Sequence, residues 1–152
     1  MFLYLSFRTL MNAETLARKP PVTVSTKATL KDVAKILAER KVGIVVVVDE
    51  KAPQNPLGVI SERDIVRAVA TDVDLNTTAE KYMTSPVITV EASEPLWKVA
   101  EVMRTHNIRH VVVTKGGELY GVISIRDLIG EESTLRSLIE YSKAEERGPA
   151  AD

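Results

Sequence analysis

The sequence predicts an α+β fold made of two β-α-β-β-α units, each a small sheet covered by helices. A seven-residue phrase occurs twice, at residues 58–64 (GVISERD) and at residues 121–127 (GVISIRD). The similarity extends further, because a shift of 66 residues places Pro20 on Pro86 and valines 45–47 on valines 111–113. Self-similarity at a fixed spacing indicates a repeated structural unit. A unit of about 60 residues builds only a marginal core alone, so we expect the two copies to pack pseudo-symmetrically.

Each unit is expected to begin with a short apolar strand and to continue with an amphipathic helix. The first strand is predicted at residues 22–24 (VTV), and Thr29 or Lys27 is expected near the start of the helix. Apolar residues recur at helical spacing in both copies: Leu30, Val33, Ala34 and Leu37 in the first, and Leu96, Val99, Ala100 and Met103 in the second.

Two strands joined by a hairpin follow in each unit, and a second helix comes after them. The strands are expected at Ile44–Val48 and Leu57–Ile60, and again at His110–Val113 and Tyr120–Ile123. From Gly58 onward the shift between the copies becomes 63, so the first copy holds three extra residues. We expect these residues in a surface loop within Asp49–Pro56, because its Pro, Asn and charged residues favour a loop. The closing helices are expected from residues 64–70 and 127–129.

Composition limits the classes of function. The chain has 20 basic and 21 acidic residues, a balance that disfavours nucleic acid and anionic membranes as partners. It has no cysteine, and its histidines are His106 and His110, so disulfides are excluded and a zinc site is disfavoured. No segment approaches the roughly 18 apolar residues of a membrane span. We therefore expect a soluble cytoplasmic protein, with residues 1–11 as an N-terminal extension.

A Ser, an Arg and an Asp fall at the strand-to-helix junction of each copy: Ser61, Arg63 and Asp64, and Ser124, Arg126 and Asp127. Two interpretations stay open. In the first, Ser and Asp are helix caps and Arg63 forms a surface ion pair with Glu62. In the second, the unpaired N–H groups of the helix N-terminus bind a phosphate. An arginine there opposes the helix dipole but becomes favourable beside a phosphate. Ile125 replaces Glu62 in the second copy, which weakens the ion-pair interpretation for Arg126.

The doubled phrase, the order of the elements and the strand sequence Ile-Arg-His-Val-Val-Val at residues 108–113 resemble a tandem pair of CBS domains, the cystathionine-β-synthase-type regulatory module. The resemblance covers roughly residues 12–128. We expect the first repeat at 12–76, the second at 77–130, and a C-terminal helix and tail at 131–152, with Leu135, Leu138 and Ile139 on one face of the helix. Nothing longer is attached, so a stand-alone pair is expected.

The resemblance implies a non-catalytic module that binds an adenosine nucleotide between the repeats and acts as an energy or ligand sensor for a partner. AMP is the expected ligand, and ADP, ATP, NADH and S-adenosylmethionine stay open. By resemblance, Asp64 and Asp127 would hold the ribose hydroxyls. The phosphate would lie against Ser61, Arg63, Ser124 and Arg126. The adenine would lie against Thr23, Thr89, Val22, Val24, Ile88 and Val90.

Arg109 and His110 are further candidates, because proteins similar to this chain often have a basic residue at the start of this strand. The first copy has Gly43 and Ile44 at these positions, so we expect two unequal clefts, one richer in positive charge. His110 is equally compatible with a structural role in the core or at the strand edge.

The alternative function is a constitutive dimeric scaffold without a ligand. CBS pairs commonly dimerise through their helices, and we expect Leu37, Met103 and Trp97 on the helix surfaces to serve this contact. Ligand-dependent melting would distinguish the sensor from the scaffold. An enzyme is disfavoured, because the sequence has no P-loop, no cysteine nucleophile and no carboxylate cluster for Mg²⁺.

Overall fold

The computed structural model describes residues 11–130, 139 and 142–143. The elements of the first repeat are α2 (Ala13–Leu16), β1 (Thr23–Ser25), α3 (Leu30–Arg40), β2 (Ile44–Asp49), β3 (Ala52–Ser61) and α4 (Glu62–Ala70). Those of the second are α5 (Ala79–Tyr82), β4 (Thr89–Glu91), α6 (Leu96–His106), β5 (His110–Lys115), β6 (Glu118–Ser124) and α7 (Ile125–Gly130). They form two three-stranded sheets, which confirms the predicted α+β class.

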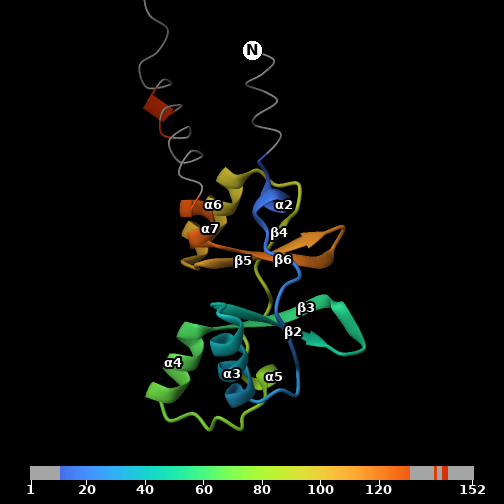
Figure 1. Cartoon of the computed structure of the whole chain (residues 1–152), viewed down its shortest axis with the longest axis vertical. Helices are drawn as coiled ribbons and strands as arrows, with labels where there is room; N and C mark the ends of the chain where they lie inside the picture. Colours follow the sequence, from blue (N-terminus) through green and yellow to red (C-terminus); the bar gives the residue numbers. More distant parts are fainter. Residues whose placement is uncertain (1–10, 131–138, 140–141, 144–152) are drawn as a thin grey trace, which may run out of the picture.

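The two sheets have the same topology and lie face to face (Figure 1). In each, a short first strand pairs in parallel with the central strand, and the central strand pairs antiparallel with the third. Helices α3, α4 and α5 lie on the outer side of the first sheet, and α2, α6 and α7 lie on the outer side of the second. Each sheet is therefore enclosed between helices and the other sheet.

This enclosure explains the continuous valine runs of the central strands. Val45 and Val47 belong to the core beneath the helices of the first sheet, whereas Val46 and Val48 pack with Val112 of the second sheet. Successive side chains of a strand point to opposite faces, so a strand that is buried on both faces needs an apolar residue at every position.

The short helices α2 and α5 exchange partners between the repeats. Ala13 of α2 lies in the core of the second repeat, and its N–H donates to the carbonyl of Glu94 at 2.8 Å. Ala79 of α5 lies in the core of the first repeat, and its N–H donates to the carbonyl of Ala28 at 2.7 Å. The expected boundaries at 12–76 and 77–130 divide the chain in sequence order. They therefore assign α2 to the first repeat and α5 to the second, although each packs in the core of the other repeat.

The prediction for Asp49–Pro56 is correct in placing the segment at the surface, because residues 49–55 are exposed, but it is wrong in expecting a loop. Strand β3 starts at Ala52 and has 10 residues, against 7 in β6, so the extra residues lengthen the hairpin. The register shifts on either side of Val48 accommodate the additional length. β3 is an edge strand, where Pro is tolerated because one row of backbone groups needs no partner strand.

The expectation that Leu37 and Met103 are exposed is also wrong, because both side chains are buried in the helix-covered cores. Among the described residues, the exposed large apolar side chains are Val66, Val69, Trp97, Ile129 and Ile139. Residues 1–10 of the expected extension and most of the expected last helix, including Leu135 and Leu138, lie outside the described residues.

Candidate functional site

Both strand-to-helix junctions form the same capping box. The Ser61 Oγ accepts a hydrogen bond from the Asp64 N–H at 3.2 Å, and the Asp64 Oδ2 accepts one from the Ser61 N–H at 2.8 Å. Ser124 and Asp127 make the same two bonds at the same distances. The capping interpretation is therefore correct for both pairs. It uses one carboxylate oxygen of each Asp, so Oδ1 stays outside the box and can take another partner.

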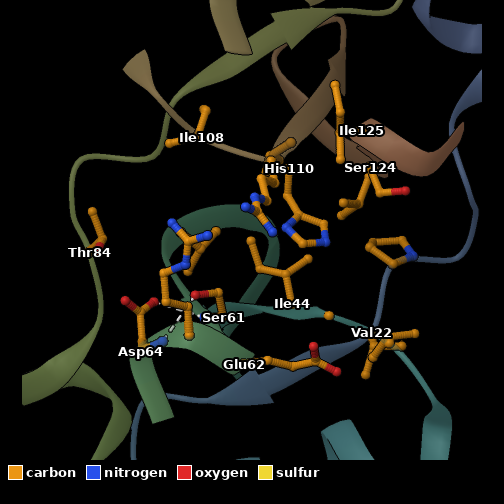
Figure 2. Close-up of a pocket in the computed structure, with 18 of the residues that line it drawn as sticks. Val22, Ile44, Ser61, Glu62, Asp64, Thr84, Ile108, His110, Ser124 and Ile125 are labelled. Carbon is orange, nitrogen blue, oxygen red and sulfur yellow. Dashed lines mark hydrogen bonds between the residues drawn. The ribbon is translucent and has the colours of Figure 1, made fainter. Parts of the chain in front are cut away.

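The two junctions meet at one cleft of about 580 Å³ that both repeats line (Figure 2). This volume lies within the roughly 300–1,000 Å³ that is usual for small-molecule sites. Most lining residues occur as pairs related by the internal repeat, including Val22 and Ile88, Val59 and Val122, Ser61 and Ser124, Arg63 and Arg126, and Asp64 and Asp127. The cleft therefore has two similar halves, which we call the Asp64 half and the Asp127 half.

Most of the predicted site residues line this cleft: Val22, Ser61, Arg63, Asp64, Ile88, Arg109, His110, Ser124, Arg126 and Asp127. Four others do not. Val24 and Val90 are buried in the two helix-covered cores, and Thr23 and Thr89 are exposed outside the cleft lining. We therefore drop the side chains of these four residues from the candidate site and keep Val22 and Ile88, which precede the first strands.

The cleft is rich in positive charge. Six basic side chains line it, against three carboxylates: Arg18, Lys41, Arg63, Arg67, Arg109 and Arg126 against Glu62, Asp64 and Asp127. Within the described part of the chain, no ion pair involves Arg63, Arg109 or Arg126, so the Arg63–Glu62 pair of the first interpretation is absent. Guanidinium groups gathered in a concave surface attract an anion, and their planar donors match the oxygens of a phosphate.

His110 reaches toward the middle of the cleft, next to Ile44 (Figure 2). Its burial lowers the pKa of the imidazole; Glu62 and Asp127 oppose this shift, and Arg109 and Arg126 reinforce it. The ring is therefore mainly neutral at neutral pH. A Cβ on Gly43 would lie 2.8 Å from its Nε2, so Gly43 leaves the space that the ring occupies. A larger residue at position 43 would collide with the His110 ring, which explains why the first repeat has glycine where the second has Arg109.

Arg18 is a cleft residue that the sequence did not reveal. Its Nε donates to the Oδ1 of Asp127 at 2.8 Å, across 109 residues of chain. The internal repeat places Thr84 at the equivalent position, and both residues line the cleft. The alignment of the two repeats shows arginine at one of these positions and threonine at the other. Only the fold shows that Arg18 lies beside Asp127.

Two other kinds of site are absent from the part of the chain that the structure describes. No group of three or more His, Asp or Glu side chains there is arranged to hold a metal ion. None of the helices in that part is long and apolar enough to cross a bilayer.

Comparison with known proteins identifies the family. The family model of the CBS domain matches residues 13–71 and 79–133. The chain belongs to the CBS domain family. The CBS domain protein PAE2072 from Pyrobaculum aerophilum, solved in complex with AMP, is 45% identical, with a TM-score of 0.80 over 86% of this chain and 99% of that chain. The CBS domain pair of protein MJ0100, solved with 5′-methylthioadenosine and S-adenosyl-L-methionine, is 28% identical, with a TM-score of 0.74 over 82% of this chain and 97% of that chain.

Curated sequences include longer relatives of this chain. A 17.7 kDa protein of Acidianus ambivalens is 37% identical over 111 residues, which are 72% of this chain and 62% of that protein. A 33.4 kDa protein of Thermofilum pendens is 31% identical over 134 residues, which are 86% of this chain and 43% of that protein. This CBS pair therefore spans about half the length of the curated relatives it matches.

Proposed function

We propose that this CBS pair is a non-catalytic regulatory module that binds an adenosine nucleotide, AMP above all, in the cleft between its repeats. The observation that carries the proposal is the meeting of two Ser-x-Arg-Asp junctions at one cleft, where Arg63, Arg109 and Arg126 have no ion-pair partner among the described residues. The solved relatives described above contain AMP in one case and two adenosine compounds in the other, which supports the adenosine part of the ligand.

The Asp64 half offers candidate partners for the ribose and the phosphate, and the cleft as a whole offers apolar surface for the adenine. The Asp64 Oδ1 is outside the capping box and can accept from the ribose hydroxyls; a 2′-deoxyribose would leave this acceptor short of a donor. The Ser61 Oγ accepts from the Asp64 N–H, so its own proton is available to a phosphate oxygen. Val22 and Ile88 supply apolar surface for the adenine.

The arginines suggest how binding would be transmitted. A phosphate between the repeats would offset the mutual repulsion of Arg63, Arg109 and Arg126 and favour a closed arrangement of the two halves. The size of any regulatory effect equals the difference in ligand affinity between the two arrangements. A module of this kind would act in the cytoplasm, where adenosine nucleotides report the energy state, on a partner protein that reads the arrangement.

The test is thermal unfolding with AMP, ADP, ATP, NADH and S-adenosylmethionine. At about 100 times its dissociation constant, a ligand of the folded state adds roughly 2.7 kcal/mol, so the melting temperature should rise clearly with AMP. Asp64→Asn keeps an oxygen for the Ser61 N–H but weakens the ribose acceptor, so it should reduce this rise.

A matched control separates capping from ligand binding. Asp32 closes a capping box with Thr29, with bonds of 3.0 and 3.1 Å, and does not line the cleft. Asp32→Asn should therefore change the unliganded stability as Asp64→Asn does, but leave the AMP-induced rise intact. A rise that both variants lose equally would contradict the ribose-binding role.

The second candidate is a constitutive homodimeric scaffold. It is favoured by the exposed apolar side chains of Val66 and Val69 on α4, Trp97 on α6 and Ile129 on α7, which a partner surface could bury. Unfolding that no nucleotide affects would make this scaffold the preferred function and would leave the junctions as helix caps alone.

A further inference from the structure

The two halves of the cleft have the same backbone pairing beside the junction carboxylates Asp64 and Asp127. Arg18 forms an isolated β-bridge with Val122, with N–H···O distances of 2.9 and 3.1 Å. Thr84 forms the equivalent bridge with Val59 at 3.0 and 3.1 Å. Figure 2 shows Thr84 on the same side of the cleft as Asp64. The halves therefore differ here in the side chain, arginine against threonine, rather than in the path of the chain.

The arginine occupies the carboxylate oxygen that a ribose would need. The Oδ1 of Asp127 accepts from the Arg18 Nε at 2.8 Å, and its Oδ2 accepts from the Ser124 N–H, so both oxygens are engaged. The Asp127 side chain is only 9% exposed beneath Arg18.

Asp64 is more exposed than Asp127, and among the described residues its Oδ1 has no hydrogen-bonded cation. Its side chain is 22% exposed, and the nearest cation, Arg67 Nη1, lies 3.8 Å from its Oδ1, beyond hydrogen-bonding distance. One oxygen of Asp64 is thus available to a cis-diol, whereas the corresponding oxygen of Asp127 already has a charged donor.

We propose that Arg18 closes the Asp127 half, so that the module binds one AMP-type nucleotide at Asp64 and accepts a second at Asp127 only after Arg18 is displaced. This inference rests on the proposed function. A ribose at Asp127 would have to replace a hydrogen bond from a charged guanidinium with hydrogen bonds from uncharged hydroxyl groups. The Arg18 side chain is 72% exposed, so its displacement is permitted but disfavoured, and we expect the second site to be weaker by about tenfold.

The experiment is calorimetric titration of the full chain with AMP. The wild-type chain should bind one nucleotide tightly per chain. Arg18→Thr, which copies the residue of the other half, should add a second site about tenfold stronger than any second site of the wild type. Thr84→Arg should weaken the tight site. Combining Asp64→Asn with Arg18→Thr should leave one strong site.

Lys19→Ser is the matched control. Lys19 is the neighbour of Arg18, its counterpart in the second copy is Ser85, and its Nζ donates to the Tyr120 hydroxyl rather than to Asp127. It removes one positive charge from the same segment and should leave the stoichiometry unchanged. The melting temperature of each unliganded variant, together with the milder Arg18→Gln, establishes that a change in binding does not reflect unfolding.

The outcomes separate the inference from the function on which it rests. Two equal AMP sites in the wild type, weaker binding in Arg18→Thr, or loss of the tight site in Asp127→Asn rather than in Asp64→Asn would overturn the role of Arg18 and leave nucleotide binding intact. Absence of AMP binding in the wild type and in every variant would overturn the proposed function and this inference together.

Discussion

Gly121→Ala should destabilise the protein more than the equivalent change in the first repeat, Gly58→Ala. Both glycines begin the repeated motif, and both are buried. A Cβ on Gly121 would lie 2.6 Å from the carbonyl oxygen of Arg18, which is backbone. A Cβ on Gly58 would meet the Met83 side chain instead, at 2.6 Å from its Cγ and 2.8 Å from its Cβ.

The expected loss in the free energy of unfolding depends on which atoms must move to make room for the new Cβ. In Gly121→Ala the segment at Arg18 must shift, which strains the two hydrogen bonds of the Arg18–Val122 bridge, at 2.9 and 3.1 Å. Overpacking costs about 1–3 kcal/mol, and each weakened hydrogen bond adds roughly 0.5–1.5 kcal/mol. We expect a loss of about 2–4 kcal/mol in the free energy of unfolding. Rotation of the flexible Met83 side chain moves its Cγ and Sδ away, and only a small shift is then needed to relieve the 2.8 Å contact with its Cβ, so we expect about 1–2 kcal/mol for Gly58→Ala.

Urea unfolding of the two variants and the wild type, with comparison of midpoints and slopes, measures the difference. The prediction is wrong if Gly58→Ala loses as much stability as Gly121→Ala or more, or if Gly121→Ala loses less than about 1 kcal/mol. Either result would mean that the backbone at Arg18, which pairs with Val122, moves as readily as the Met83 side chain.

Two further predictions concern the cleft and the contact between the sheets. Burial lowers the pKa of His110 in the folded state, so the unfolded chain binds a proton at this residue more readily. Neutral His110 therefore favours the folded state at a pH above the ordinary histidine pKa of about 6.5. This stabilisation is lost as the pH falls through the lower pKa of the folded state. Unfolding measured between about pH 7.5 and pH 5 should therefore show a smaller acid-induced loss for His110→Ile, which copies Ile44, and an equal loss would contradict the assignment. Val112 is buried between the sheets, so Val112→Ala should cost about 2 kcal/mol in urea unfolding, whereas Val66→Ala on the exposed face of α4 should stay within about 0.5 kcal/mol; similar losses for the two would contradict the sheet packing.

From the amino-acid sequence alone we could predict the repeated unit, the order of its elements and the junctions that carry the candidate site. These features depend on local or periodic information. Thr29 and Asp32 cap α3 because their side chains reach backbone groups three residues away, and Ser61 and Asp64 do the same for α4. The valine runs predicted buried strands, because burial on two faces removes the alternation with polar residues.

Other features depend on which distant segments of the chain pack together, and only the folded structure shows them. The exchange of α2 and α5 between the repeats is invisible in an alignment of the two copies, since both helices have the same place in each unit. The hydrogen bond from Arg18 to Asp127 joins positions 109 residues apart, and no local pattern predicts a contact over that distance. The repeat alignment makes Arg18 and Thr84 equivalent, but only the packed structure shows that Arg18 bonds to Asp127 and so adds to the inequality of the two halves of the cleft.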